Sequence, residues 1–201
     1  MRFFRLLIFP LLAGGFLHAQ SKSDESDFAG KIAKFREDYK ATLLSNPYAP
    51  LKSKAELAKL NFFPARSAYR FDGKFLRTPQ AKTTTMATSD GGTSDFVKYG
   101  EVIFRHESIE HRLSIFKLLH PTVEYFLIAF TDLTNGKSTY GGGRYLDFSP
   151  DQIADGQIEI DFNKSYNPWC HYSDQYPCPL PPKENHLSIA IPVGEGLYSR
   201  D

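Results

Sequence analysis

The chain lacks a charge excess of either sign. Lysine and arginine total 24 and aspartate and glutamate total 23, which gives a formal net charge of +1 over 201 residues. Proteins that bind nucleic acid through charge carry a basic excess or a basic cluster, so we predict no nucleic-acid partner. With 41% hydrophobic and 23% charged residues, the composition is ordinary for one globular domain that buries its own core.

Long hydrophobic runs are also missing, and the one apolar segment lies near the N-terminus. Two arginines precede an apolar stretch from Leu6 to Phe16, and a small-residue cleavage site follows at Ala19. The stretch is shorter than the roughly 20 residues that a transmembrane helix needs, so we interpret residues 1–19 as a signal peptide rather than a membrane anchor. We expect an exported protein, periplasmic or secreted, with a flexible mature N-terminus over residues 20–27, one domain over residues 28–201 and no transmembrane span.

Cysteine is scarce, and the only two cysteines are Cys170 and Cys178. In an oxidising compartment, two cysteines so close in sequence are most simply a disulfide, and closing such a short loop stabilises a fold by about 2–3 kcal/mol. The alternative is a metal site that includes His171 and His186. Zinc sites usually have tighter cysteine pairs or more ligands, so we predict the disulfide and no metal site.

The aromatic content favours a β-rich interior, because 17 phenylalanines and 11 tyrosines stand against 1 tryptophan. Apolar residues at helical spacing predict a helix over residues 28–43, and a capping box at Ser53 and Glu56 predicts a short second helix. Short apolar segments separated by turn residues follow to the C-terminus. We therefore predict a mainly β single domain with N-terminal helices, which is an antiparallel barrel or sandwich.

Turn residues set the predicted strand boundaries. Asp72-Gly73 lies between two apolar runs and predicts a two-residue hairpin, and Asn135-Gly136 predicts a turn into a short strand over residues 138–140. The other strands are predicted over residues 67–71, 74–78, 82–88, 97–104, 112–118, 124–131, 157–163 and 187–193.

The residues best suited to a functional site are concentrated between Thr139 and Asn185, where glycines and prolines accompany polar side chains. Gly141–Gly143 permits a bulge whose backbone N–H groups converge on an anion, and Arg144 follows it. The alternative is a plain bend of the chain, with Arg144 as a buried ion-pair partner of one of several aspartates. Those aspartates are Asp132, Asp147 and Asp161.

Three side chains are candidates for acid–base chemistry. Asp161 lies beside Asn163 on the polar side of a strand, and a covering Cys170–Cys178 loop would perturb its pKa as a general base requires. Alternatively, Asp161 accepts backbone N–H groups as an anchor for that loop. Histidine is the residue type whose charge changes near neutral pH, which makes His171 a candidate, although a merely hydrogen-bonded histidine is the alternative. Two prolines fix the approach to Glu184. The Gly-x-Ser-x-Gly elbow of common hydrolases is absent.

Three long motifs resemble the bacterial domain-of-unknown-function family 1684. They run from Phe130 to Asp147, from Asp161 to Cys170 and from Cys178 to Asn185. The family has no established reaction, substrate or cofactor, so the resemblance implies signature positions and export but no catalytic role. The signature positions that it implies are Tyr140, Arg144, Asp161, Asn163, Asn167, Cys170, Cys178 and Asn185.

One functional prediction and two alternatives follow. We predict a pocket for a small anionic ligand, built from the Gly141–Arg144 bulge beneath the Cys170–Cys178 loop, without a cofactor. The first alternative is a hydrolase with Asp161 or Glu184 as general base, and the second is a structural or interaction protein without a small-molecule site. The predicted ligand-binding residues are Tyr140, Gly142, Gly143, Arg144, Asn163, Asn167 and Asn185, and the predicted catalytic residues are Asp161, Glu184 and His171.

Overall fold

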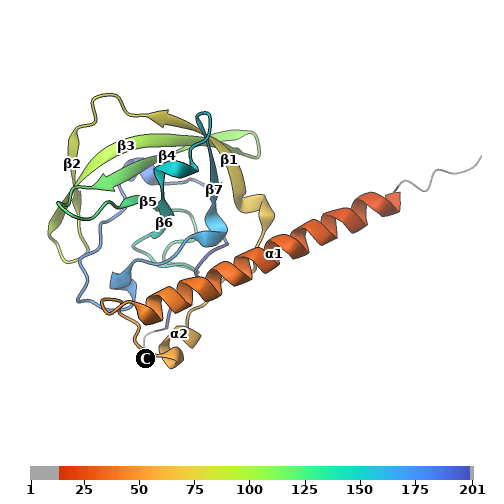
Figure 1. The fold of residues 1–201 in the computed structure, drawn as a ribbon, viewed down its shortest axis with the longest axis horizontal. Coiled ribbons are helices and arrows are strands. Elements are labelled where there is room, and N and C mark those ends of the chain that lie inside the picture. Colours follow the sequence, from red (N-terminus) through yellow and green to blue (C-terminus); the bar gives the residue numbers. More distant parts are fainter. Residues whose placement is uncertain (1–13, 200–201) are drawn as a thin grey trace, which may run out of the picture.

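A curled antiparallel sheet of seven strands follows two helices (Figure 1). The structure is a computed structural model and describes residues 14–199. The strand order is β6-β5-β4-β3-β1-β7, and β2 pairs with the first part of the long strand β3. The strands are β1 Arg70–Arg77, β2 Thr83–Ala87, β3 Thr93–His106, β4 Ile109–Leu118, β5 Phe126–Phe130, β6 Arg144–Phe148 and β7 Gln157–Asp161. The predicted fold class is confirmed, and the sheet is curled like half of a barrel.

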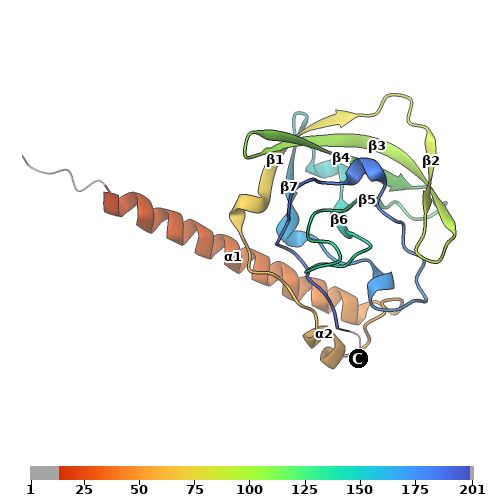
Figure 2. The same ribbon diagram turned by 180° about the vertical axis from the view of Figure 1, so that it is seen from behind.

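The helices agree with their sequence signals. The first, α1 (Gly14–Ser45), ends directly before Asn46-Pro47, and its N-terminal half projects beyond the sheet (Figure 2). The second, α2 (Lys54–Ala58), begins with the predicted capping box, in which the Ser53 hydroxyl accepts from the Glu56 N–H at 3.2 Å. Short 3-10 helices cover Ser67–Tyr69, Pro150–Gln152, Phe162–Lys164, Trp169–His171 and Lys183–Asn185. In the described part of the chain, none of the helices is both long and apolar enough to cross a membrane.

The N-terminal part of α1 differs from the prediction for the mature N-terminus. Residues 20–27, expected to be flexible, are helical, and Glu25 accepts a hydrogen bond from the Ser67 N–H at 2.9 Å. Most of the predicted signal peptide, residues 1–13, lies outside the described residues, and the predicted cleavage site at Ala19 lies within α1. The side chains that pack α1 on the domain begin at Phe28, which is buried.

The predicted hairpin at Asp72-Gly73 is wrong, because β1 runs straight through these residues. Gly73 pairs with Ile158 of β7 in the interior of the sheet. A Cβ atom at Gly73 would lie 2.5 Å from the Val102 side chain and 3.2 Å from the Ile103 carbonyl oxygen. Close packing between strands therefore requires glycine at position 73. Glycine is also common in turns, so the same residue suggested a hairpin here.

Three other differences concern the C-terminal half. The predicted strand over residues 138–140 is a turn, the residues from Arg144 form the unpredicted strand β6, and the predicted closing strand over residues 187–193 is irregular. The last segment still binds the sheet, since the Leu187 N–H donates to the Thr131 carbonyl at 2.8 Å. In residues 187–193, single hydrogen bonds to the sheet replace the regular strand pairing that the alternating hydrophobic pattern of this segment predicts.

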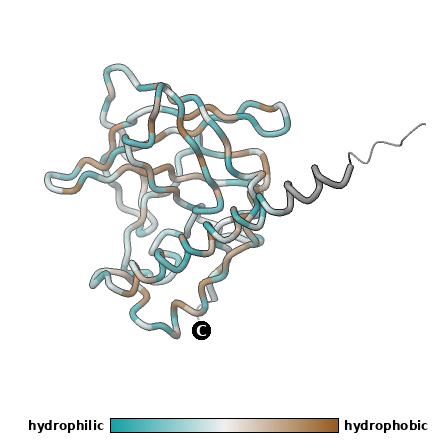
Figure 3. Tube along the Cα trace, turned by 45° about the vertical axis from the view of Figure 1, so that its right-hand side comes forward, coloured by the Kyte–Doolittle hydropathy of each residue, from teal (hydrophilic) through white to brown (hydrophobic). Residues whose placement is uncertain are grey.

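Apolar side chains cover both faces of the sheet, and hydrophobic positions concentrate along the strands (Figure 3). Alternation along β5 decides which face each residue serves: Phe126, Ile128 and Phe130 belong to the larger core, whereas Leu127 and Ala129 belong to the core beneath both cysteines. The two ends of the strand path, β6 and β7, have no pairing with each other among the described residues. The gap between these two edge strands is closed at one point, where Tyr145 of β6 and Tyr166 exchange two backbone hydrogen bonds at 2.9 and 3.0 Å.

Candidate functional site

Arg144 does not line a ligand pocket. Its side chain is fully buried, and Nη2 lies 2.9 Å from Asp132 Oδ2. The guanidinium also donates to three backbone carbonyls of the C-terminal segment, those of Ile191 at 2.7 Å, Glu195 at 3.3 Å and Val193. The predicted role as a fork for an anion is therefore corrected. Arg144 is a buried ion-pair partner of Asp132, and the pair ties β6 to the C-terminal segment.

The glycines before Arg144 allow a turn and close packing. Gly143 has a left-handed φ of 90°, and a Cβ atom there would lie 2.6 Å from both the Phe130 carbonyl and the Pro181 ring. A Cβ atom at Gly142 would lie 2.5 Å from the ring of Tyr140. Protein atoms therefore fill the space on the Cβ side of both glycines, and the Gly143 N–H donates to the Tyr140 carbonyl at 3.1 Å rather than to an anion.

Asp161 and Asn163 are brought together as predicted, but they anchor a different segment. Asp161 Oδ1 accepts from the Asn163 N–H at 3.0 Å and from its side-chain amide at 2.8 Å. Asn163 in turn exchanges two hydrogen bonds with the backbone of Arg66, at 2.8 and 2.9 Å. The pair therefore fixes the chain before β1 rather than the Cys170–Cys178 loop.

Two more predicted ligand-binding residues are fully buried structural amides. Asn185 accepts from the Ser114 N–H at 2.7 Å and donates to the Ala129 carbonyl at 2.8 Å, so it bridges β4 and β5. Asn167 donates to the Gly196 carbonyl at 2.7 Å. Asn185 serves backbone groups of β4 and β5 beyond the two residue pairs at which these strands pair, and Asn167 serves a carbonyl of the irregular C-terminal segment.

Sequence reasoning missed Glu195, which is fully buried. Its carboxylate accepts from the Tyr172 hydroxyl at 2.5 Å and from the Asn167 N–H at 3.0 Å. Burial raises the pKa of Glu195 to about 7, although these hydrogen bonds and the charge of Arg144 oppose the shift. A glutamate between two glycines near the chain end is the only sequence signal for this position.

The Cys170–Cys178 loop is compact. Both cysteines are buried and present as thiols, and Cys178 Sγ accepts from the Cys170 N–H at 3.1 Å. His171 accepts from the Tyr198 N–H at 3.0 Å, and its ring centroid lies 4.3 Å from that of Tyr140. His171 therefore has the hydrogen-bonded role that was its alternative, and Tyr140 packs against the loop. The disulfide stays a prediction.

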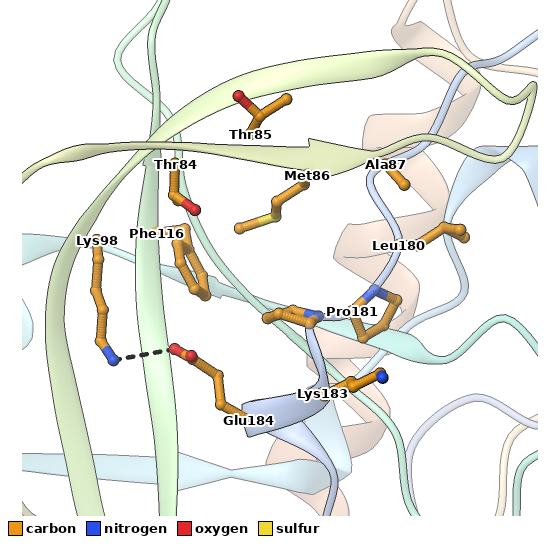
Figure 4. Close-up of a pocket in the computed structure, with 11 residues that line it drawn as sticks. Thr84, Thr85, Met86, Ala87, Lys98, Phe116, Leu180, Pro181, Lys183 and Glu184 are labelled. Carbon is orange, nitrogen blue, oxygen red and sulfur yellow. Dashed lines mark hydrogen bonds and ion pairs between the residues drawn. The ribbon is translucent and has the colours of Figure 1, made fainter.

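Glu184 lines a pocket of about 400 Å³ formed by β2, β3, β4 and residues 180–184 (Figure 4). Lys98 Nζ lies 2.9 Å from Glu184 and 2.7 Å from Glu101, so the charges of this pocket neutralise one another. Partial burial would raise the pKa of Glu184, but hydrogen bonds from Ser114 and Lys98 lower it below its ordinary value. An ionised, paired carboxylate of this kind is a poor general base near neutral pH.

A larger cleft, which we call the α1 cleft, lies between α1 and the edge strands β6 and β7. Its volume is about 640 Å³. Apolar side chains of the main core form its floor, namely Ile128, Leu146, Phe148, Ile158 and Ile160. Its polar lining holds five carboxylates, Asp38, Asp147, Asp151, Glu159 and Asp161, and one base, Lys164. Asp161 and Glu184 therefore line different pockets.

Asp147 is the most unusual carboxylate of the α1 cleft. It accepts from the Tyr166 hydroxyl at 2.6 Å and from the Tyr125 hydroxyl at 3.3 Å. Asp147 is exposed and lines the cleft, and the protein groups packed around its carboxylate raise its pKa above the ordinary value by desolvation. Burial also raises the pKa of Tyr166, so the hydroxyl stays protonated and donates. Sequence reasoning named Asp147 only as an ion-pair partner of Arg144.

Comparison with known proteins identifies a family. The family described as a protein of unknown function, DUF1684, matches residues 55–196. The chain belongs to this family. A similar fold occurs in the solution NMR structure of an uncharacterised protein from gene locus rrnAC0354 of Haloarcula marismortui, with a TM-score of 0.67 and 27% identity over 87% of this chain and 96% of that chain. No curated protein matches the chain.

The DUF1684 match contains one side of the α1 cleft but not the other. The residues contributed by β6 and β7 fall within residues 55–196, whereas the α1 wall, which includes Phe35, Tyr39 and Thr42, precedes them. In this DUF1684 chain the helix therefore completes a concavity whose floor belongs to the matched domain.

Proposed function

We propose that the protein is an exported small-molecule binding protein whose ligand lies in the α1 cleft. The observation that carries the proposal is the apolar floor between two edge strands that do not pair with each other, because ligand sites are concave, mainly apolar and furnished with a few polar groups. The α1 cleft combines a volume of about 640 Å³ with polar side chains on its rim.

The geometry favours this cleft over the sites predicted from sequence. Arg144 is fully buried beside Asp132, so it has no face for the small anionic ligand that the sequence suggested. A hydrolase would need its base and its oxyanion donors at one cavity. Asp161 and Glu184 line separate pockets, and Glu184 is paired with Lys98.

Export and a disulfide belong to the same proposal. Cleavage near Ala19 would remove the first turns of α1 and leave Phe28 and Ile32, the buried residues that seat the helix. Oxidation would then join Cys170 and Cys178, whose loop already has a hydrogen bond across it. Intact-mass measurement of protein recovered from the periplasm or medium should give a chain that begins at Gln20 and lacks two hydrogen atoms. A retained N-terminus or two free thiols would contradict this part.

Nile red, a neutral apolar dye whose emission rises in apolar surroundings, tests the ligand site. We expect saturable binding of one dye per chain. Thr42→Trp places an indole in the cleft from the exposed face of α1 and should abolish binding. The matched control is Ala41→Trp, because Ala41 is also exposed, is the adjacent residue and does not line the cleft. Absence of saturable binding to the wild-type protein, or equal loss in both variants, would contradict the proposal.

A further inference from the structure

We infer that the ligand of the α1 cleft carries an amine or quaternary ammonium group that lies against Asp147. This inference rests on the proposed function and specifies its ligand class. The cleft supplies the apolar contact area, and the charges around it decide which head group is compatible with the site.

The carboxylates around the cleft differ in how they are neutralised. Asp38 lies 2.9 Å from Lys34, and Glu159 lies 3.6 Å from Arg70, so both have a basic partner on the protein surface. Asp161 is held by Asn163 and lies near the charge of Arg36. These three acids need no external cation. Asp151 accepts from the Ser149 hydroxyl and, like Asp147, has no ion pair among residues 23–199.

Asp147 has no ion pair among residues 23–199, whose side chains the structure describes. Two tyrosine hydroxyls donate to it and orient it, but they carry no positive charge. A carboxylate that lines an apolar cleft and has no basic partner prefers a cation. A ligand ammonium group supplies that cation, whereas an anionic head group would be repelled.

The aromatic residues beside Asp147 suit the same head group. The rings of Tyr39 and Tyr166 lie 5.7 Å apart, and Phe148 contributes to the floor next to them. Aromatic faces attract ammonium groups through their quadrupole, and such groups often bind between tyrosines. The cleft already shows this contact, because Lys164 Nζ lies 5.8 Å from the centroid of the Phe35 ring.

The pocket that Glu184 lines does not share this combination. In the pocket of Figure 4, Lys98 lies between Glu101 and Glu184, so its charges are satisfied internally. Of these two pockets, only the α1 cleft combines an apolar floor with an accessible carboxylate that lacks a basic partner in the described part of the chain.

The experiment uses two probes of the same chain length and opposite charge, octyltrimethylammonium and octyl sulfate, both below their micellar concentrations. Each is titrated against bound Nile red. We expect the ammonium probe to displace the dye at a concentration roughly tenfold lower than the sulfate probe, as a partly desolvated cation site predicts. This comparison on the wild-type protein does not depend on any variant folding.

Asp147→Asn locates the preference, because an asparagine oxygen still accepts from Tyr166 while the charge is removed. The preference should fall to about twofold or less in this variant, a loss of roughly 1 kcal/mol of cation attraction. Asp155→Asn is the matched control: it makes the same change of net charge on an exposed loop residue with a φ of 51°, which asparagine tolerates.

The outcomes separate the inference from the proposed function. If Nile red binds but the two probes displace it at equal concentrations, the ammonium site is overturned and a cleft for a neutral ligand remains. The same holds if the preference for the ammonium probe survives in Asp147→Asn. Failure of Nile red to bind would overturn both. A preference lost in Asp147→Asn and retained in Asp155→Asn is the result that supports the inference.

Discussion

Removing the charge of Asp132 should strongly destabilise the fold. Asp132→Asn keeps an oxygen that accepts from the Thr134 N–H, now 2.8 Å from Asp132 Oδ1, but it turns an amide donor toward Nη2 of Arg144. The guanidinium would then be buried without a counterion. Breaking a buried ion pair on one side typically costs about 3–5 kcal/mol, and we expect a loss in this range.

Urea denaturation at neutral pH, followed by tyrosine and tryptophan fluorescence, measures this loss as a shift of the midpoint at constant slope. Asp155→Asn, on an exposed loop, is the control and should change the free energy of unfolding by less than about 0.5 kcal/mol. Arg144→Met should lower the free energy of unfolding less in the Asp132→Asn background than in the wild-type protein, because the two residues are coupled. A loss below about 1 kcal/mol for Asp132→Asn would refute the reasoning, since carbonyl groups alone would then satisfy Arg144.

The helices and strands were predictable where a residue pattern has only one structural meaning. The helical spacing before Asn46-Pro47 located the C-terminal part of α1, and the capping box at Ser53 located the start of α2. The all-apolar run of β5 gave a strand that is buried on both sides. In each case local propensity and tertiary packing agree.

The errors arose where a residue type serves two purposes. Gly73 reads as a turn residue, yet it lies in a strand because the Val102 side chain leaves no room for a Cβ atom. Arg144 reads as a ligand-binding residue, and whether it faces a cavity depends on Asp132 and on a C-terminal segment about 50 residues away. Such contacts depend on how the chain folds back, which spacing alone does not encode.

The α1 cleft was not predictable for a similar reason. Its floor comes from β5, β6 and β7, and its wall comes from α1, whose apolar spacing predicted a helix but not what that helix would cover. Asp147 and Tyr166 lie in two different sequence motifs, and the backbone bridge between Tyr145 and Tyr166 brings them together. The sequence did indicate that polar residues of the motifs meet, but not that most of them meet in the interior.

Two further predictions concern stability. Because the pKa of Glu195 is raised from its ordinary 4.5 to about 7, the folded state holds a proton that the unfolded state has released, so stability should fall as pH rises between these values, by up to about 3 kcal/mol. Glu195→Gln should flatten this dependence in urea melts from pH 4 to 8, and an unchanged slope would exclude Glu195 as its source. Gly73→Ala should cost about 1–3 kcal/mol through overpacking against Val102, whereas Gly30→Ala, at an exposed helix position with nothing near its added Cβ, should be neutral or stabilising. Equal effects of the two glycine substitutions would show that close packing is not what requires Gly73.

The central claim is that the ligand lies between α1 and the gap of the edge strands. Chemical-shift mapping by NMR, with octyltrimethylammonium added to isotope-labelled protein, tests it most directly. The account predicts that the largest shifts lie in residues 35–42, 146–148 and 158–160, which line the α1 cleft. Shifts centred instead on Lys98 and Glu184, or around Arg144, would contradict it.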